Sequence, residues 1–249
     1  MLSDFSVLEI IVVNVIFLWT GFVRSGLGFG GAALGLPFML FVRDQPIFWL
    51  PVVGAHLLFF SGLTIGTELR RVDWRYIGKS SIYIIPAAFV GVFGLISLPS
   101  FWLNIFIYSV TLLYGVMWVL QRDFASHNTF VDKILLAIGG YIAGTSLTGA
   151  PLIVAVYMRN VPIEKLRNTL FVLWFVLVAI KMITLASFGV DLQLLSALAL
   201  LPIAAVGHFL GLRVHTAILR NQALFKRSMG GVLVLVCILG LMSLISKGI

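Results

Sequence analysis

Charged residues and cysteine are scarce in this chain. Of its 249 residues only 10% are charged, against about 25% in a typical soluble domain, and 61% are hydrophobic. This composition excludes an ordinary soluble fold. The one cysteine, Cys237, can form no intrachain disulfide, and we expect it to be a packing residue.

Acidic residues are the scarcer charge, with nine Asp and Glu against 17 Lys and Arg, which gives a formal net charge of +8. Basic residues beside apolar segments usually set membrane orientation and contact anionic lipid headgroups. The excess therefore predicts membrane lipids as partners and does not indicate nucleic acid. Near the first residue, Asp4 and Glu9 stand where a secretory signal has basic residues, and no small-residue cleavage site follows, so we expect no such signal.

Long apolar segments make up most of the sequence, whose mean hydropathy is +1.11. A helix needs about 20 apolar residues to cross the hydrocarbon core of a membrane. Seven segments are long enough, near 5–23, 47–67, 77–97, 101–120, 166–188, 192–212 and 228–246. Shorter apolar pieces lie at 32–42, 134–143 and 151–158. The sequence therefore predicts an all-α polytopic membrane protein.

A glycine-containing pattern occurs twice. Residues 26–33 read GLGFGGAA and residues 144–151 read GTSLTGAP, so Gly149 follows Gly31 by 118 positions (149 − 31). Val72-Asp73 and Val190-Asp191 share that offset, and Pro86 to Gly91 precedes Pro202 to Gly207 by 116 positions (202 − 86). We expect two repeats, 1–120 and 121–249, in one integral membrane domain, each headed by a glycine-broken helical segment.

The basic residues predict how the repeats are oriented. Three loops hold most of them: Arg70, Arg71, Arg75 and Lys79; Arg159, Lys165 and Arg167; Arg213, Arg220, Lys226 and Arg227. If 134–158 enters the membrane and returns as helix, break and helix, all three loops face the cytoplasm, as the positive-inside rule requires. If 134–158 instead crossed the membrane once, the second and third loops would lie on the opposite side from the first. The returning segment makes the repeats inverted, which suits alternating access. Segment 1–43 is longer than the corresponding segment at the head of the second half, and it could instead form a full hairpin.

The two broken segments predict an anion site. Non-helical backbone survives in hydrocarbon only against protein or a water-filled cavity, and a half-helix that starts at such a break directs free N–H groups toward it. Hydroxyl donors are available at Ser25 in the first run and at Thr145, Ser146 and Thr148 in the second. The glycines that we expect to line the site are Gly28, Gly30, Gly31 and Gly149. Close helix packing is the alternative role of these small residues, whereas a P-loop is excluded because neither run ends in Gly-Lys-Ser/Thr.

Four ionisable side chains inside apolar sequence are further candidates for substrate binding. Lys181 lies within an apolar span and Arg24 precedes the first glycine run, and two cations agree with an anionic substrate. Their alternative is snorkelling toward an interface. His56 and His208 could relay a proton or bind an oxyanion, or could be interhelical hydrogen-bond partners.

The order and duplication of these motifs resemble the TauE/SafE family of sulfite-exporter-type permeases. In that family each half has a glycine-rich run in a broken segment, a Val-Asp-Trp-like motif, and then a span with proline followed by glycine. The first half here has Gly28-Phe29-Gly30-Gly31, Val72-Asp73-Trp74 and Pro86 to Gly91; the second has Gly149-Ala150-Pro151, Val190-Asp191 and Pro202 to Gly207. The resemblance covers essentially the whole chain.

Several positions depart from the family pattern: Ala32, Thr148 and Ala150 replace expected glycines, and Arg24 and Lys181 stand where the family is usually apolar. The resemblance implies transport of a small anion, such as sulfite, an organosulfonate or a related carboxylate. It also implies a multi-pass location in a bacterial-type cytoplasmic (inner) membrane.

The sequence thus favours a secondary transporter that works by alternating access, with no cofactor, no metal and no enzymatic activity. An anion channel or a non-transporting membrane scaffold stays open, and inverted repeats do not exclude a channel. An intramembrane enzyme is disfavoured, because the sequence has no Gly-x-Ser-x-Gly, no paired intramembrane aspartates and no His-Glu-x-x-His. A homodimer is compatible with a transporter of this size.

Overall fold

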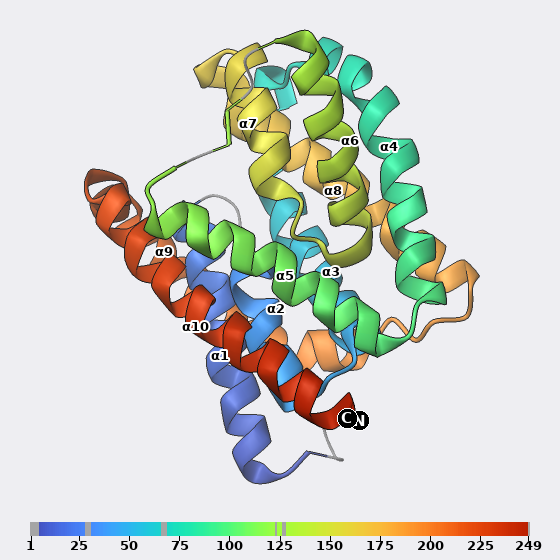
Figure 1. The fold of residues 1–249 in the computed structure, drawn as a ribbon. Helices are drawn as coiled ribbons and strands as arrows, with labels where there is room; N and C mark the ends of the chain where they lie inside the picture. The colour runs from blue at the N-terminus through green and yellow to red at the C-terminus, as the bar shows by residue number, and fades with distance from the viewer. Residues whose placement is uncertain (1–4, 28–30, 66–68, 123, 126–127, 249) are drawn as a thin grey trace. The chain divides into compact units, whose positions relative to one another are not determined.

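The computed structural model describes residues 5–27, 31–65, 69–122, 124–125 and 128–248, without the side chains of 26–27, 64–65, 216–219 and 247–248. In these ranges it has ten α-helices, one short 3₁₀ helix and no strand (Figure 1). The elements are α1 (Val7–Leu27), α2 (Gly31–Val42), α3 (Pro46–Ile65), η2 (Leu69–Arg71), α4 (Trp74–Ser97), α5 (Ser100–Val119), α6 (Thr129–Ser146), α7 (Ala150–Asn160), α8 (Ile163–Ser187), α9 (Leu194–Arg220) and α10 (Gln222–Gly248).

The order of long and short helices repeats along the chain. The short helices α2 and α7 have 12 and 11 residues, and each follows a longer helix, α1 or α6. Their last residues, Val42 and Asn160, are 118 positions apart (160 − 42), the offset of the glycine pattern. Three long helices follow each of them. The α-helices therefore divide into two sets of five, α1–α5 and α6–α10.

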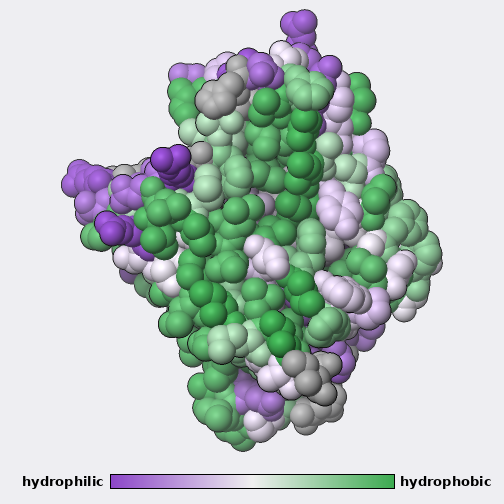
Figure 2. Space-filling model, viewed as in Figure 1, coloured by the Kyte–Doolittle hydropathy of each residue, from purple (hydrophilic) through white to green (hydrophobic). Residues whose placement is uncertain are grey.

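Seven described helices are long and apolar enough to cross a membrane, as the hydropathy pattern predicts. They are Val7–Ser25, Pro46–Leu63, Trp74–Ser97, Ser100–Val119, Ile163–Ser187, Leu194–His215 and Gln222–Ser246. Many of their apolar side chains lie on the outside, and Figure 2 shows such side chains over most of the visible face. Leu195 is 85% exposed and Ile183 69% exposed. So large an apolar surface suits contact with lipid and not with water.

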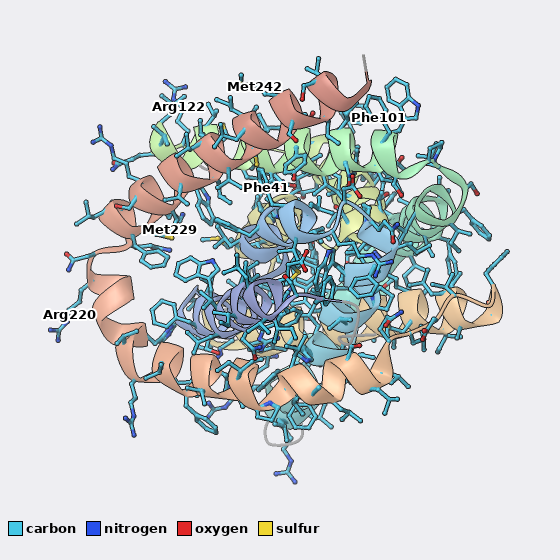
Figure 3. All side chains as sticks on the ribbon, turned by 90° about the horizontal axis from the view of Figure 1, so that it is seen from below. Phe41, Phe101, Arg122, Arg220, Met229 and Met242 are labelled. Atoms are coloured by element: carbon cyan, nitrogen blue, oxygen red, sulfur yellow. The ribbon has the colours of Figure 1, made fainter. Side chains whose placement is uncertain are left out.

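The helices form two compact units, and each unit draws on both halves of the chain. Unit 1 comprises 1–49, 98–123 and 195–249, and unit 2 comprises 50–97 and 124–194. In unit 1, α5 and α10 run antiparallel: Gly115 lies against Gly230, and Tyr108 against Gly240. The end of α5 and the start of α10 therefore share one end of the unit, where Arg122 and Arg220 project outward (Figure 3). The buried Cys237 of α10 is a packing residue, as expected.

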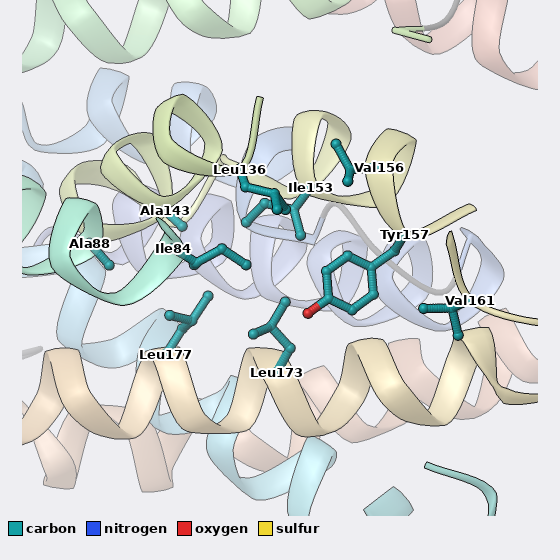
Figure 4. Close-up of a cluster of buried hydrophobic side chains, with 10 residues drawn as sticks. All are labelled: Ile84, Ala88, Leu136, Ala143, Ile153, Val156, Tyr157, Val161, Leu173 and Leu177. Atoms are coloured by element: carbon teal, nitrogen blue, oxygen red, sulfur yellow. The ribbon is translucent and has the colours of Figure 1, made fainter. Parts of the chain in front are cut away.

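Unit 2 is built around a parallel pair of helices, α4 and α6. Gly140 lies against Ile84 and Gly144 against Ala88, one turn further along both helices. A Cβ at Gly144 would overlap the Ala88 carbonyl oxygen, so only glycine allows this approach. A buried apolar cluster joins the pair to α7 and α8 (Figure 4). Its members are Ile84, Ala88, Leu136, Ala143, Ile153, Val156, Tyr157, Val161, Leu173 and Leu177.

Helices α6 and α7 form an antiparallel hairpin in unit 2. At its open end the buried Asp132 carboxylate of α6 accepts hydrogen bonds from Arg159 at 2.9 Å and Asn160 at 3.2 Å, both at the end of α7. The chain therefore returns to the end from which α6 starts, as the predicted helix–break–helix requires.

The first two basic loops lie at that same end of unit 2. The Asp73 N–H, before α4, donates to Oγ1 of Thr169 near the start of α8 at 3.0 Å. The Asp73 carboxylate also caps α4, because its Oδ1 accepts the Tyr76 N–H at 2.9 Å. The aspartate of the Val-Asp-Trp motif thus begins a helix, and the exposed Trp74 suits a position at the membrane–water interface.

Candidate functional site

The break between α6 and α7 spans residues 147–149 and is called the second break. Leu147 ends α6 with a left-handed φ of 61°, and its N–H bonds the Ala143 carbonyl. Gly149, with φ −70°, precedes α7, and Pro151 occupies its first turn, where the missing N–H is not needed. The left-handed residue at this break is therefore Leu147 and not a glycine.

The glycines around the second break provide close contact. A Cβ at Gly149 would overlap the Gly139 carbonyl oxygen and would approach the Ala143 nitrogen to 2.7 Å. A Cβ at Gly91 of α4 would come within 3.0 Å of Oγ1 of Thr145. These contacts close the walls of the break, so its polar groups are screened from solvent.

Three hydroxyl groups lie in the break, and their side chains are at most 1% exposed. Thr145 and Ser146 donate to the carbonyls one turn back in α6, Tyr141 at 2.9 Å and Ile142 at 3.0 Å. The Ser146 and Thr148 oxygens are 2.7 Å apart. With the Ser146 proton on Ile142, the Thr148 hydroxyl is the donor of that bond, and the hydroxyl oxygens keep acceptor lone pairs.

Lys181 of α8 brings a positive charge to the same break. Its side chain is 2% exposed, and its ammonium donates to the Thr145 carbonyl oxygen at 3.2 Å. No carboxylate in the described ranges forms an ion pair with it. A cation is favoured at the C-terminal end of α6, because the last backbone carbonyls of a helix have no partner within the helix. The N–H groups at the start of α7 lie on the other side of the break. An ammonium has three donors, so this single carbonyl uses one of them.

The first break, between α1 and α2, is described only at its edges. Gly28 and Gly30 lie outside the described residues. Gly31 begins α2, where an added Cβ would lie 3.1 Å from Cβ of Arg24. Trp19 of α1 donates to the Leu34 carbonyl of α2 at 3.2 Å, so α1 and α2 also fold back on each other. Arg24 is half-buried at this turn.

The structure pairs Ser25 with His208 in unit 1. Ser25 Oγ contacts Nδ1 of His208, which α9 brings beside α1, and lies 3.1 Å from the Gly21 carbonyl oxygen. No sequence pattern indicates this pairing, because the two residues are 183 positions apart. His56 belongs to unit 2, where its buried ring packs edge-on against Phe60.

Nine of the twelve candidate residues fall into two groups, and His56, Gly28 and Gly30 are in neither. Thr145, Ser146, Thr148, Gly149 and Lys181 gather at the second break in unit 2; Arg24, Ser25, Gly31 and His208 lie near the first break in unit 1. The sequence pattern did not indicate that Asp132 and Arg159 hold the α6–α7 hairpin closed, although an aspartate just before a short apolar segment is a usable signal. Among the described residues, no three His, Cys, Asp or Glu side chains gather as a metal site.

Seven apolar helices of spanning length, together with two helical hairpins of unequal arms, define an integral multi-pass membrane protein. The family model described as "Sulfite exporter TauE/SafE" matches residues 13–239. The chain belongs to this family of membrane transporters. No curated protein and no solved structure matches the chain.

Proposed function

We propose that the protein is a secondary transporter that carries a small anion across a bacterial-type inner membrane by alternating access. The observation that carries the proposal is the buried ammonium of Lys181 at the second break. Removing a charge from water costs several kcal/mol unless the charge is paired, and a neutral carbonyl compensates only part of this cost. An anion that binds Lys181 completes the pairing.

The surroundings of Lys181 favour an oxyanion over a halide-sized ion. The Lys181 ammonium and the N–H groups at the start of α7 are donors held in place by the helices, and the Thr148 hydroxyl can turn away from Ser146 to donate to a bound anion. Such donors bind the several oxygens of a sulfite, sulfonate or carboxylate group. Family membership supports sulfite or an organosulfonate as the substrate, and a related carboxylate has the same chemistry.

The helix order supports two repeats of inverted orientation as the basis of alternating access. Five helices in each half follow the same order, the first two basic loops lie at one end of unit 2, and Arg122 and Arg220 lie at one end of unit 1. In this proposal the second break binds the anion in unit 2, and the first break is its counterpart in unit 1.

A thermal-shift screen of the purified protein tests the proposed function. The anions are sulfite, sulfate, isethionate, taurine and acetate, each compared with chloride at equal ionic strength. A ligand that binds the native state raises the melting temperature by mass action. We expect sulfite or a sulfonate to do so, and to exchange with labelled substrate in proteoliposome counterflow. Conductance without counterflow would instead identify a channel, and turnover of the anion would identify an enzyme.

A further inference from the structure

Helix α5 of unit 1 carries two buried polar side chains with an oxygen that bonds no described residue. The hydroxyl of Thr111, which is 0% exposed, has no hydrogen-bond partner in the described ranges, and neither does Oδ1 of Asn104, which is 2% exposed. The amide nitrogen of Asn104, by contrast, donates to the Asp44 carbonyl at 2.8 Å. Leaving a buried polar atom unbonded is costly, so such atoms are expected where a ligand binds.

Thr111 differs in this respect from other buried hydroxyls of the protein. A serine or threonine inside a helix commonly donates to the carbonyl one turn back. Four buried hydroxyls in the described helices do so at 2.7–3.0 Å: Thr145, Ser146, Thr169 and Thr184. Thr111 makes no such bond to the Ile107 carbonyl. Its oxygen therefore keeps both lone pairs for a partner outside α5.

The short helix α2 lies beside Thr111 and runs antiparallel to α5. The Tyr108 hydroxyl of α5 donates to the Pro37 carbonyl of α2 at 3.4 Å. Further along α5, Trp118 shares a buried cluster with Leu34, which precedes Pro37. Thr111 lies between Tyr108 and Trp118 on α5, so it faces the segment of α2 from Leu34 to Pro37.

Pro37 leaves one carbonyl of α2 without its usual partner in this segment. A helix carbonyl accepts the N–H four residues on, and proline has no N–H to give to the Ala33 carbonyl. That carbonyl is directed along α2 toward Pro37, and hence toward the part of α2 that faces Thr111. Helix α10 closes the other side, because a Cβ at Gly240 would overlap the Tyr108 ring.

Oxygen acceptors predominate between the two helices, which favours a cation as the ligand. They are the Thr111 and Tyr108 hydroxyl oxygens and the Ala33 carbonyl. A divalent cation requires carboxylates, and no acidic cluster occurs in the described ranges. Carbonyl and hydroxyl oxygens in an interrupted membrane helix are ligands of sodium. Asn104 is seven residues from Thr111, about 10 Å along α5, and extends the polar face without contacting the same ion.

We propose that unit 1 binds a sodium ion between α2 and α5, with Thr111 Oγ1, the Tyr108 hydroxyl oxygen and the Ala33 carbonyl oxygen as ligands. The site itself goes beyond the proposed function and does not depend on it. Because these ligands are neutral, we expect binding in the millimolar range. The role of the ion rests on the proposed function: sodium that moves with an anion lowers the net charge that crosses the membrane.

The test is a thermal-shift titration of the purified full chain with sodium chloride, in which choline chloride keeps the ionic strength constant. Sodium should raise the melting temperature to a plateau by mass action, and potassium should do so much less. Thr111→Val keeps the shape of the side chain and removes its oxygen, so the Kd for sodium should rise about tenfold or more without loss of stability in choline. The matched control is Thr184→Val, which removes a buried hydroxyl that already bonds a carbonyl and should leave this Kd unchanged.

Tyr108→Phe removes only a hydroxyl and should also weaken sodium binding, so it decides the question if Thr111→Val does not fold. Equal shifts with sodium, potassium and choline in the wild-type protein would overturn the inference. A sodium Kd that is unchanged in Thr111→Val or in Tyr108→Phe would overturn it as well. Anion binding is measured separately in choline salts. Failure of sodium alone leaves the proposed function standing, whereas failure of the anions alone leaves the sodium site standing and removes its coupling role.

Discussion

Replacing Lys181 by Met distinguishes an anion-binding lysine from one that only supports the fold. Met keeps most of the side-chain volume and removes the charge. The ammonium is 2% exposed and bonds one neutral carbonyl, Thr145 O, at 3.2 Å. Exchanging a buried ion for an apolar residue of similar volume is often neutral, or stabilising by about 1–4 kcal/mol. We therefore expect the ligand-free Lys181→Met protein to melt no lower than wild type.

The same substitution should weaken anion binding. A hydrogen bond to a charged group contributes about 1.5–3 kcal/mol. This free energy corresponds to about 10–150-fold in Kd. Stability and affinity are thus expected to change in opposite directions, and a thermal-shift titration with sulfite or isethionate measures both in one sample.

Lys165→Met is the matched control, because Lys165 is on the same helix but exposed. It should change neither property. If Lys181→Met binds the anion within about twofold of wild type, Lys181 does not bind the anion. If the variant loses its folded state, Lys181 is instead needed as a cap for the carbonyls at the end of α6.

Three further substitutions test the hairpin and its surroundings. Gly144→Ala should destabilise the protein by about 1–3 kcal/mol, because the added Cβ would overlap a carbonyl of α4. The control is Gly78→Ala, which has open space around it and should be neutral or slightly stabilising. Melting temperatures of the two variants test this difference. Asp132→Ala should destabilise the protein by about 1–3 kcal/mol and speed amide hydrogen exchange in α7. A double-mutant cycle with Arg159→Ala should show coupling between the two side chains. Additive effects of the two substitutions would contradict the ion pair. Thr148→Val keeps the shape of the side chain and removes its hydroxyl. It should raise the Kd for the anion about 2–10-fold with little change in melting temperature. An unchanged Kd would exclude this hydroxyl from the site.

Hydropathy was sufficient to predict the spans, because the ability of a segment to cross a membrane depends on its own length and composition. The seven predicted segments coincide with the seven described spans to within a few residues at most ends. The returning α6–α7 hairpin also followed from local information, since the positions of Arg159, Lys165 and Arg167 required it.

Contacts between distant segments could not be predicted in the same way. Ser25 and His208 are 183 positions apart, and Lys181 is 36 positions from the Thr145 carbonyl that it bonds. Which helices meet depends on where glycine allows backbones to touch. The sequence shows the glycines but does not show which backbone each of them contacts. Lys181 could therefore be proposed as a site residue, whereas its location at the end of α6 could not be predicted.

The roles of individual turn residues were also beyond the sequence pattern. Glycine is the residue that most readily adopts a left-handed backbone, yet Leu147 adopts it at the second break. The reason is in the packing: Gly144 and Gly149 are needed where a side chain would overlap a neighbouring backbone. Close contact takes precedence over dihedral preference at this break.

The same glycine contacts bear on which parts of the protein can move during transport. Helix α4 belongs to the first half of the chain but packs on α6 of the second half, and α9 of the second half packs on α1 of the first. Rocking one sequence half against the other would have to separate Gly144 from Ala88 and Gly21 from Ala204, where the backbones are in van der Waals contact. Motion of the two compact units as bodies leaves both contacts intact. Pairs of spin labels on α4 and α6 should therefore keep their distance when the anion binds, whereas a pair on α4 and α5, which are adjacent in sequence but belong to different units, should change.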